Sequence, residues 1–391
     1  MRQSKLISAE SVCVTHPDLV ADTISDAILQ AYYEQDKDSH VACETMVTTD
    51  FVLVAGEIKS KATIDVESII RDAVKNLGYT DPAQGFSYDT LEIVNKLHEQ
   101  SADIDMGVTK ENAEESGAGD QGFMIGYASS ETENLMPLPI AMARALTDKL
   151  TEVRESGESE IILPDGKAQV VLDYNVQDSL DMPRLVSVLI SNHHVDIPTQ
   201  EVRAEIIQKV IIPVVAKFGY TLEDVVVLVN PTGRFVIGGP NGDTGLTGRK
   251  LAVENYGPAC PIGGGASAGK DLSKVDRSAA YAARYVAKNI VASGLATECE
   301  VQISYAIGVA EPTSIYVDTK GTLSKVFCSS DEDLTKLVKE VFELRPYAIR
   351  TWINNAGVDF NQVRKIGAYG NDIFPWEQLD KVEEIKKHLG I

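Results

Sequence analysis

One order of elements occurs three times along this chain, and it limits the folds that the chain can adopt. In the first third, a helical period from Asp18 to about Glu34 precedes two strand-forming runs at 40–48 and 51–58, and a second amphipathic helix runs from Val66 to Gly78. The middle third repeats helix, strand, strand and helix at 140–154, 168–175, 184–191 and 199–215. The last third repeats them at 275–293, 300–309, 314–318 and 331–342.

This repetition predicts an α+β chain of three structurally similar domains related by pseudo-threefold repetition. Each domain would be a β-sheet covered on one face by helices. The stretch 100–122 is polar, acidic and contains glycine, and composition alone favours a plain linker there. We expect an N-terminal domain at 1–103, a mobile linker at 104–120, a central domain at 121–232 and a C-terminal domain at 233–391.

Composition and charge exclude several classes of protein. No apolar run is long enough to cross a bilayer, and the first ten residues lack the apolar core of a signal peptide, so we expect a soluble, cytoplasmic protein without a membrane partner. The net charge of −22 disfavours nucleic acid as a partner and makes a local basic pocket more informative. Five scattered cysteines without a CxxC spacing predict neither a disulfide framework nor a zinc site.

Residues 234–277 contain many glycines among charged side chains and look like a phosphate cradle. The spacing from Gly264 to Lys270 fits a P-loop, but Asp271 stands where that motif needs a hydroxyl, and no clear strand precedes it. A P-loop phosphotransferase is therefore disfavoured. Together with Lys167 in LPDGKAQ, the cations of this stretch have the charge to neutralise a triphosphate.

Two aspartates at predicted helix starts have competing interpretations. Thr15 with Asp18, and Ser273 with Asp276, have the spacing of a capping box, and on local grounds this interpretation is favoured. The alternative is that both aspartates bind Mg²⁺ that bridges phosphates, while His16 donates to a developing anion.

Four further residues have an ordinary interpretation beside a functional one. Glu44 and Glu57 lie on predicted strands, where an exposed face is the default. Asp120 in GAGDQG suits a turn. Phe235 would be a core residue, or it would stack on a base in a nucleotide pocket.

These motifs in this order resemble the methionine adenosyltransferase family, also called S-adenosylmethionine synthetases. The resemblance covers almost the whole chain, through HPD (16–18), ACET (42–45), GAGDQG (117–122), NPTGRFVIGGP (230–240), GDTGLTGRK (242–250), GGGASAGKD (263–271), the helix at 274–291 and YAIGVAEPTS (305–314). It implies attack of the methionine sulfur on C5′ of ATP, with release of triphosphate that the same site hydrolyses to pyrophosphate and phosphate. A thioether needs no general base, so cations and metal ligands without a nucleophile–base pair suit this reaction.

The resemblance also implies roles, cofactors and an assembly. Two Mg²⁺ per site would be held by Asp18 and Asp276, and K⁺ by Glu44. The family forms its sites between two subunits, as a homodimer or a homotetramer, and residues 100–110 match its gating loop. The implied catalytic residues are His16, Lys167, Arg249, Lys250, Lys270 and Asp120. The implied ATP-binding residues are His16, Asp165, Lys167, Arg234, Phe235, Asp243, Arg249, Lys250, Ala266 and Lys270. The implied methionine-binding residues are Glu57, Gln100, Asp243 and Lys274.

The chain departs from the family pattern at positions beside these motifs. They are Thr15 and Leu19 around HPD, Arg144 where a histidine is usual, and Ser267, Ala268 and Leu272 in the glycine-rich loop at 263–272, which we call the lysine loop. The charged residues assigned to chemistry are retained, so we expect an active enzyme. A binding-only relative that holds ATP or S-adenosylmethionine without turnover is the rival hypothesis.

Overall fold

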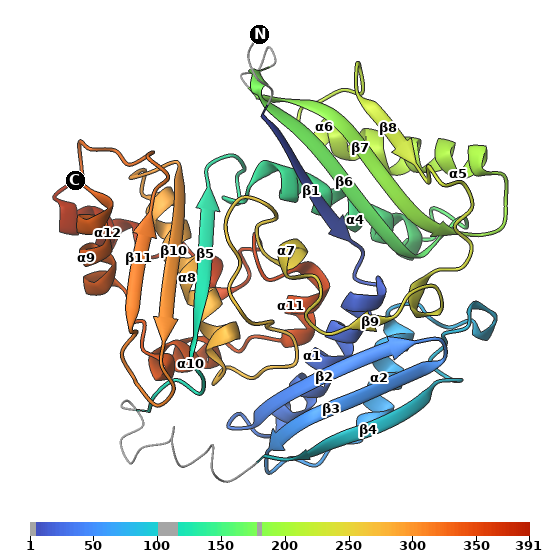
Figure 1. Cartoon of the computed structure of the whole chain (residues 1–391), viewed down its shortest axis with the longest axis horizontal. Coiled ribbons are helices and arrows are strands. Elements are labelled where there is room, and N and C mark those ends of the chain that lie inside the picture. Colours follow the sequence, from blue (N-terminus) through green and yellow to red (C-terminus); the bar gives the residue numbers. More distant parts are fainter. Residues whose placement is uncertain (1–4, 101–115, 178–181) are drawn as a thin grey trace.

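The computed structural model describes residues 5–100, 116–177 and 182–391. Most of the predicted linker, 104–120, and most of the predicted gating loop, 100–110, lie outside the described residues. Three sheets with their helices form three units around a central region that the loops between residues 239 and 275 cross (Figure 1). The α+β class and the three-domain organisation are confirmed.

Each unit has the predicted order of helix, strand, strand and helix. The first contains α1 (Pro17–Gln35), β2 (His40–Thr48), β3 (Phe51–Lys59) and α2 (Val66–Asn76). The central unit contains α4 (Leu138–Glu155), β6 (Ile162–Gln177), β7 (Pro183–His194), and a last helix made of α5 (Thr199–Ile206), the π-helical turn Ile207–Ile211 and α6 (Ile212–Lys217). The last unit contains α8 (Val275–Ala292), β10 (Glu298–Tyr305), β11 (Ser314–Asp318) and α9 (Asp331–Val341).

Other elements lie outside the three predicted repeats. The additional strands are β1 (Leu6–Val12), β4 (Glu92–Glu99), β5 (Gly122–Ser129), β8 (Val226–Val229) and β9 (Gly245–Leu246). The additional helices are α7 (Leu251–Glu254), α10 (Pro346–Asn355), α11 (Phe360–Ile366) and α12 (Val382–Leu389).

Each sheet is completed by a strand that precedes the first helix of a different unit. β1 pairs with β6 in the central sheet, β5 pairs with β10 in the last sheet, and β9 pairs with β2 in the first sheet. The resulting orders are β1-β6-β7-β8, β11-β10-β5 and β4-β3-β2-β9. Contiguous boundaries at 103, 121 and 233 therefore do not describe these sheets.

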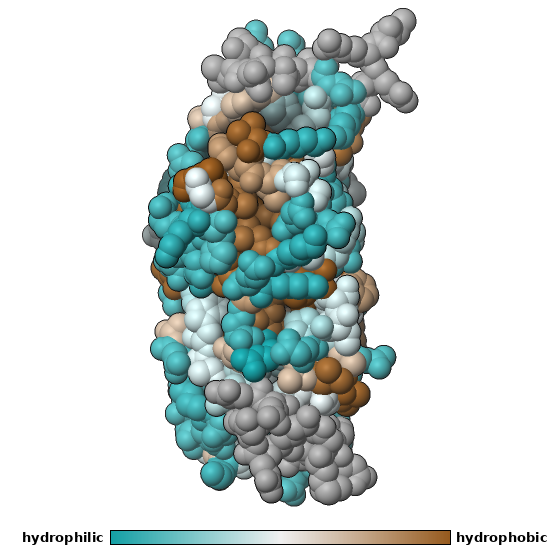
Figure 2. Space-filling model, turned by 90° about the vertical axis from the view of Figure 1, so that its left-hand side faces the viewer, coloured by the Kyte–Doolittle hydropathy of each residue, from teal (hydrophilic) through white to brown (hydrophobic). Residues whose placement is uncertain are grey.

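Alternation along the strands decides which face of a sheet the helices cover. In β2, Val41, Cys43 and Val47 are buried toward α1, whereas Glu44 on the opposite face is exposed. One core joins the first and last units, and a second fills the central unit. The outer side of the last unit is largely hydrophilic, with a strip of hydrophobic residues between hydrophilic ones (Figure 2). Among the described residues, no helix has the length and apolar character needed to span a membrane.

Candidate active site

The start of α1 shows that Asp18 is not a helix cap. His16 is the N-cap residue, and its Nδ1 accepts a hydrogen bond from the amide of Asp18 at 3.2 Å. Thr15 instead donates its hydroxyl to the carbonyl of Pro164. The predicted capping box of Thr15 and Asp18 was therefore wrong, and the Asp18 carboxylate is available for other partners.

The buried Asp18 carboxylate gathers the cations of the GDTGLTGRK loop. Its Oδ2 accepts from Lys250 Nζ at 2.5 Å, and its Oδ1 lies 3.4 Å from Arg249 Nε. Oδ1 also accepts from the amide of Leu246 at 3.0 Å. Burial raises the pKa of Asp18, but these hydrogen bonds outweigh burial and leave the pKa below its ordinary value. One carboxylate thus holds two cations at a helix N-terminus.

His16 lies next to this cluster as a neutral imidazole. Burial lowers the pKa of His16 to about 3, and the charges of Lys167 and Lys250 act in the same direction. Because Nδ1 accepts from the Asp18 amide, the proton of the neutral ring lies on Nε2. The ring is therefore a hydrogen-bond donor beside three cations: Lys167, Arg249 and Lys250.

The lysine loop forms a second group of charges. Lys270 Nζ donates to Asp276 Oδ2 at 2.7 Å, and both side chains are about one-fifth exposed. Lys274, and not Ser273, is the N-cap residue of α8, and it makes no side-chain cap hydrogen bond, so the second predicted capping box was also wrong. Asp271 is buried and accepts from the amide of Val41 at 2.8 Å. Asp271 therefore anchors the loop to β2, in agreement with the rejection of a P-loop.

The two glycine-rich loops touch each other. Gly248 has a φ of 76°, and a Cβ placed there would lie 2.6 Å from the Cβ of Ala266. The lysine loop also extends the edge of β2, through an antiparallel bridge between Ala42 and Lys270 and a hydrogen bond from the Cys43 amide to the Gly269 carbonyl at 3.0 Å. Both loops thus meet at the first sheet.

Glu44 and Glu57 lie on the uncovered face of that sheet, as the default interpretation expected. Ala42 pairs with Glu57 on β3 and bridges to Lys270 on its other side. Burial raises the pKa of Glu44, while the charge of Lys270 opposes the change. Glu44 and Lys270 are therefore close enough to interact.

The central unit contributes Asp165 and Lys167 from β6. Asp165 is buried, and its Oδ2 accepts from the amide of Gly239 at 3.0 Å. Burial raises the pKa of Asp165 to about 6, against the opposing effects of that hydrogen bond and of Lys167. Asp243 is exposed and close enough to contribute to the raised pKa. Through the charge of Lys167, which also acts on His16, the central unit adjoins the cluster.

Five other predicted residues have contacts of their own within the described chain. Arg234 forms an exposed ion pair with Asp196 at 2.8 Å, and Phe235 packs 5.8 Å from the ring of His193. Asp120 is exposed and accepts from the amide of Gln121. The Gln100 amide donates to the Ile58 carbonyl, and Lys274 pairs with Asp271 at 3.2 Å.

Sequence reasoning missed two residues that hold this site together, Asp22 and Asp26 on α1. Asp22 Oδ1 accepts from the amide of Gly248, and Asp26 Oδ1 accepts from the amide of Gly269, both at 2.8 Å. The signal was present as aspartates at i, i+4 and i+8 in DLVADTISD. Fully buried carboxylates at this spacing require partners, and the partners here are the two loops.

Mg²⁺ is implied by the family resemblance, and the donor set fits it. Among the residues that the structure describes, no group of three or more His, Cys, Asp or Glu could hold a metal ion. Asp18 supplies one carboxylate beside Arg249 and Lys250, and Asp276 supplies one beside Lys270. Mg²⁺ is commonly held by one or two carboxylates together with substrate phosphates, so single carboxylates are the donors that such an ion needs.

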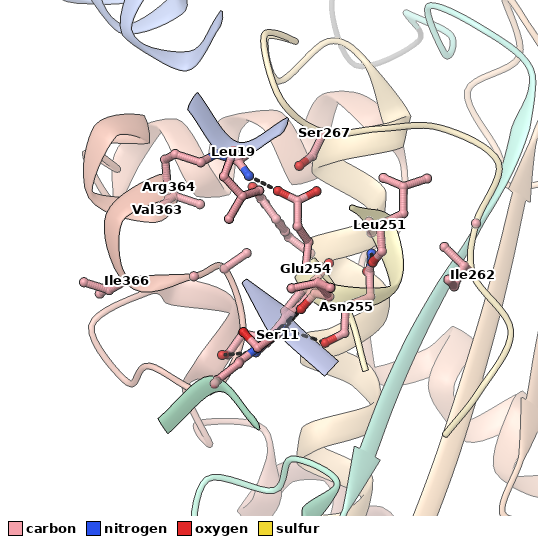
Figure 3. Close-up of a pocket in the computed structure, with 18 of the residues that line it drawn as sticks. Ser11, Leu19, Leu251, Glu254, Asn255, Ile262, Ser267, Val363, Arg364 and Ile366 are labelled. Atoms are coloured by element: carbon pink, nitrogen blue, oxygen red, sulfur yellow. Dashed lines mark hydrogen bonds and ion pairs between the residues drawn. The ribbon is translucent and has the colours of Figure 1, made fainter. Parts of the chain in front are cut away.

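A cavity of about 110 Å³ is lined in part by the lysine loop, and Figure 3 shows two of its lining residues, Glu254 and Arg364, joined as an ion pair. It is smaller than typical ligand pockets of roughly 300–1,000 Å³. Ser267 lines this cavity. Arg144, another departure from the family pattern, donates to the carbonyls of Val253 and Asn255 at 2.9 and 2.6 Å. Ser267 and Arg144 therefore belong to the residues that support the loops.

Fold and site together define an α+β protein of three units with cations and carboxylates gathered on two adjoining glycine-rich loops. Models of the N-terminal, central and C-terminal domains of S-adenosylmethionine synthetase match residues 4–102, 115–235 and 237–378. The chain is also 45% identical, over 393 aligned residues covering all of both chains, to a protein of Sulfurovum sp. (strain NBC37-1) described as S-adenosylmethionine synthase. The chain belongs to the S-adenosylmethionine synthetase family, which confirms the resemblance.

Proposed function

We propose that this protein forms S-adenosylmethionine from ATP and L-methionine and hydrolyses the released triphosphate to pyrophosphate and phosphate. The observation that carries the proposal is the gathering of Arg249 and Lys250 around the Asp18 carboxylate, beside His16, whose other charged neighbour is Lys167. Family membership supports the synthesis. The hydrolysis is supported by a charge cluster that suits the intact triphosphate as a leaving group.

The first step forms a bond between the methionine sulfur and C5′ of ATP and breaks the bond between C5′ and the triphosphate oxygen. The sulfur is already nucleophilic, so the protein must align the reactants and stabilise the departing anion. The Nε2 proton of neutral His16 suits donation of a hydrogen bond to that oxygen. Lys167, Arg249 and Lys250 are placed to neutralise the phosphates.

The ion pairs within the site suit an exchange of partners when ATP binds. Lys250 and Lys270 would leave Asp18 and Asp276 for phosphate oxygens, and each carboxylate would become available as an Mg²⁺ ligand. Bound Mg²⁺ would supply further positive charge to the phosphates, and the Glu44 carboxylate would hold K⁺ beside the lysine loop. In the second step a water oxygen would form a bond to a phosphorus atom of the triphosphate while a bridging P–O bond breaks, which releases pyrophosphate and phosphate, and the same cations would stabilise the negative charge.

Glu57, Gln100 and Lys274 are proposed to bind methionine, Asp243 both substrates, and Asp120 the reacting sulfonium. Asp165, Arg234, Phe235 and Ala266 would bind the adenosine part of ATP. We further propose a homodimer with shared sites, paired as a homotetramer; family membership supports this assembly, and the exposure of Glu57, Asp120 and Asp243 suits residues that meet a second subunit. We also propose that the protein acts in the cytoplasm.

The test is to incubate the full chain with ATP, L-methionine, Mg²⁺ and K⁺, and to measure S-adenosylmethionine, pyrophosphate and phosphate. We expect all three in equal amounts, and omission of Mg²⁺ should abolish them. Calorimetric binding of ATP by folded protein without any product would instead support the binding-only rival. Light scattering would test the dimer and the tetramer.

A further inference from the structure

Three aspartates form a row along one face of α1. Asp18, Asp22 and Asp26 are spaced by four residues, and each is at most 1% exposed. Four residues of α-helix advance about 6 Å along the axis. A row of buried carboxylates is costly unless each has a partner, so their partners indicate what the row does.

Asp22 and Asp26 each hold the residue immediately before a cation of the proposed site. Asp22 Oδ1 accepts from the amide of Gly248, which precedes Arg249, at 2.8 Å. Asp26 Oδ1 accepts from the amide of Gly269, which precedes Lys270, at 2.8 Å. One rigid helix therefore fixes the two loops at positions one helical turn apart.

Arginines from two other helices balance these buried charges. Arg277 of α8 donates to both oxygens of Asp26 at 2.6 and 2.8 Å. Arg364 of α11 donates to Asp26 at 3.0 Å, lies 3.8 Å from Asp22 Oδ2, and also pairs with Glu254. Both aspartates therefore already have their partners in the ligand-free chain, so their geometry is set before any ligand arrives.

We propose that Asp22 and Asp26 are positioning residues that fix the separation of the two glycine-rich loops, so that Arg249 and Lys270 act on one polyphosphate chain. The inference rests on the proposed function. Neither carboxylate needs to touch the substrate, because each acts through a backbone amide beside a cation. Cations that are already in place do not have to move when the leaving anion forms. The positioning should therefore lower the barrier of the reaction.

The test compares Asp22→Ala, which removes the acceptor for Gly248, with Asp22→Asn, which keeps an oxygen acceptor there. Full-length variants are titrated with tripolyphosphate by calorimetry and assayed for kcat and KM. We expect Asp22→Ala to weaken tripolyphosphate binding and lower kcat by on the order of 10²-fold, since small misplacements cost about that much. Asp22→Asn should restore both values to within about threefold of the wild type, because it keeps the hydrogen bond to Gly248.

The matched control is Arg284→Met, which breaks a fully buried ion pair with Glu377 whose contacts lie outside both loops. It should lower the melting temperature without changing the Kd for tripolyphosphate. If Asp22→Ala also lowers only the melting temperature, or if Asp22→Asn fails to rescue binding, Asp22 has no positioning role.

A second measurement needs no variant. In the ligand-free wild type, hydrogen exchange of the Gly248 and Gly269 amides should be slowed at least about 100-fold, because both are held by buried carboxylates. Exchange at the rate of an unprotected loop would overturn the inference. A wild type that binds tripolyphosphate but makes no S-adenosylmethionine would contradict only the proposed function. The positioning role is tested separately, by the Kd for tripolyphosphate and by the exchange rates of the two amides.

Discussion

Replacement of Asp18 by asparagine distinguishes between two roles of this residue, as a helix cap and as a carboxylate of the site. The Asp18→Asn variant would keep an oxygen acceptor for the Leu246 amide but lose the charge that pairs with Lys250 at 2.5 Å and Arg249 at 3.4 Å. A hydrogen bond to a charged group contributes about 1.5–3 kcal/mol. Arg249 is half exposed, so solvent screens its share, and we expect Asp18→Asn to lower the free energy of unfolding by about 2 kcal/mol.

The effect on turnover should be larger than this loss of stability implies. Without the carboxylate, the variant loses its proposed Mg²⁺ ligand and the group that orders two cations, so kcat should fall by about 10²–10³-fold. S-adenosylmethionine is measured chromatographically and unfolding is followed in urea. Asp65→Asn is the matched control, because Asp65 does cap α2 by accepting from the Ser68 amide. It should cost less than about 1 kcal/mol and leave turnover unchanged. Turnover of Asp18→Asn within threefold of the wild type would refute the reasoning.

Three further predictions concern pH and the lysine loop. The pKa of His16 is lowered to about 3 in the folded chain, whereas an ordinary histidine has a pKa near 6.5. Below about pH 6.5 the unfolded chain therefore binds more protons at His16 than the folded chain does. The free energy of unfolding should therefore fall as pH drops, by about 2 kcal/mol near pH 5, and urea titrations of His16→Asn should lack this part of the slope. Burial raises the pKa of Asp165 to about 6 in the folded chain. The free energy of unfolding should therefore fall as pH rises through about 4 to 6, where Asp165 must lose its proton in the folded chain. Asp165→Asn should be more stable than the wild type by about 1–3 kcal/mol at pH 7.5, equal to it below about pH 4, and less active; equal stability at both pH values would contradict this. Gly269→Ala should lower the free energy of unfolding, measured in urea, by at least about 2 kcal/mol more than Gly294→Ala does. The reason is that a Cβ at Gly269 would meet the Cys43 carbonyl, whereas a Cβ at Gly294 would meet nothing within 4 Å. Equal effects of these two substitutions would contradict the prediction, because they would show that the loop can move to accommodate the added Cβ.

The repeating helices and strands could be predicted because each carries a long hydrophobic period. Val20, Ile24 and Ile28 mark the buried face of α1 in the sequence as clearly as in the structure. β1 and β5 lack such a signal of partnership, because nothing in a strand's own sequence states which sheet it joins. Strand exchange between the units was therefore not predictable from local pattern.

The candidate site was predictable in its chemistry but not in its connections. Glycine-rich loops with cations indicated a polyanion, and the structure brings Arg249 and Lys250 to Asp18. The capping-box spacing at Thr15 was misleading, because Thr15 finds a partner in Pro164, about 150 residues away. Asp22 and Asp26 were overlooked for the same reason, since a buried carboxylate is recognised by its distant partner.

The exchange of β1, β5 and β9 among the sheets makes the three units mutually dependent. Removal of any one unit would take with it a strand of another sheet and leave unpaired backbone groups at a newly open edge. The units therefore cannot be treated as separable modules, and they should melt in one transition. A ligand bound at the two loops, which join the first unit to the last, should for the same reason raise the melting temperature of the whole chain.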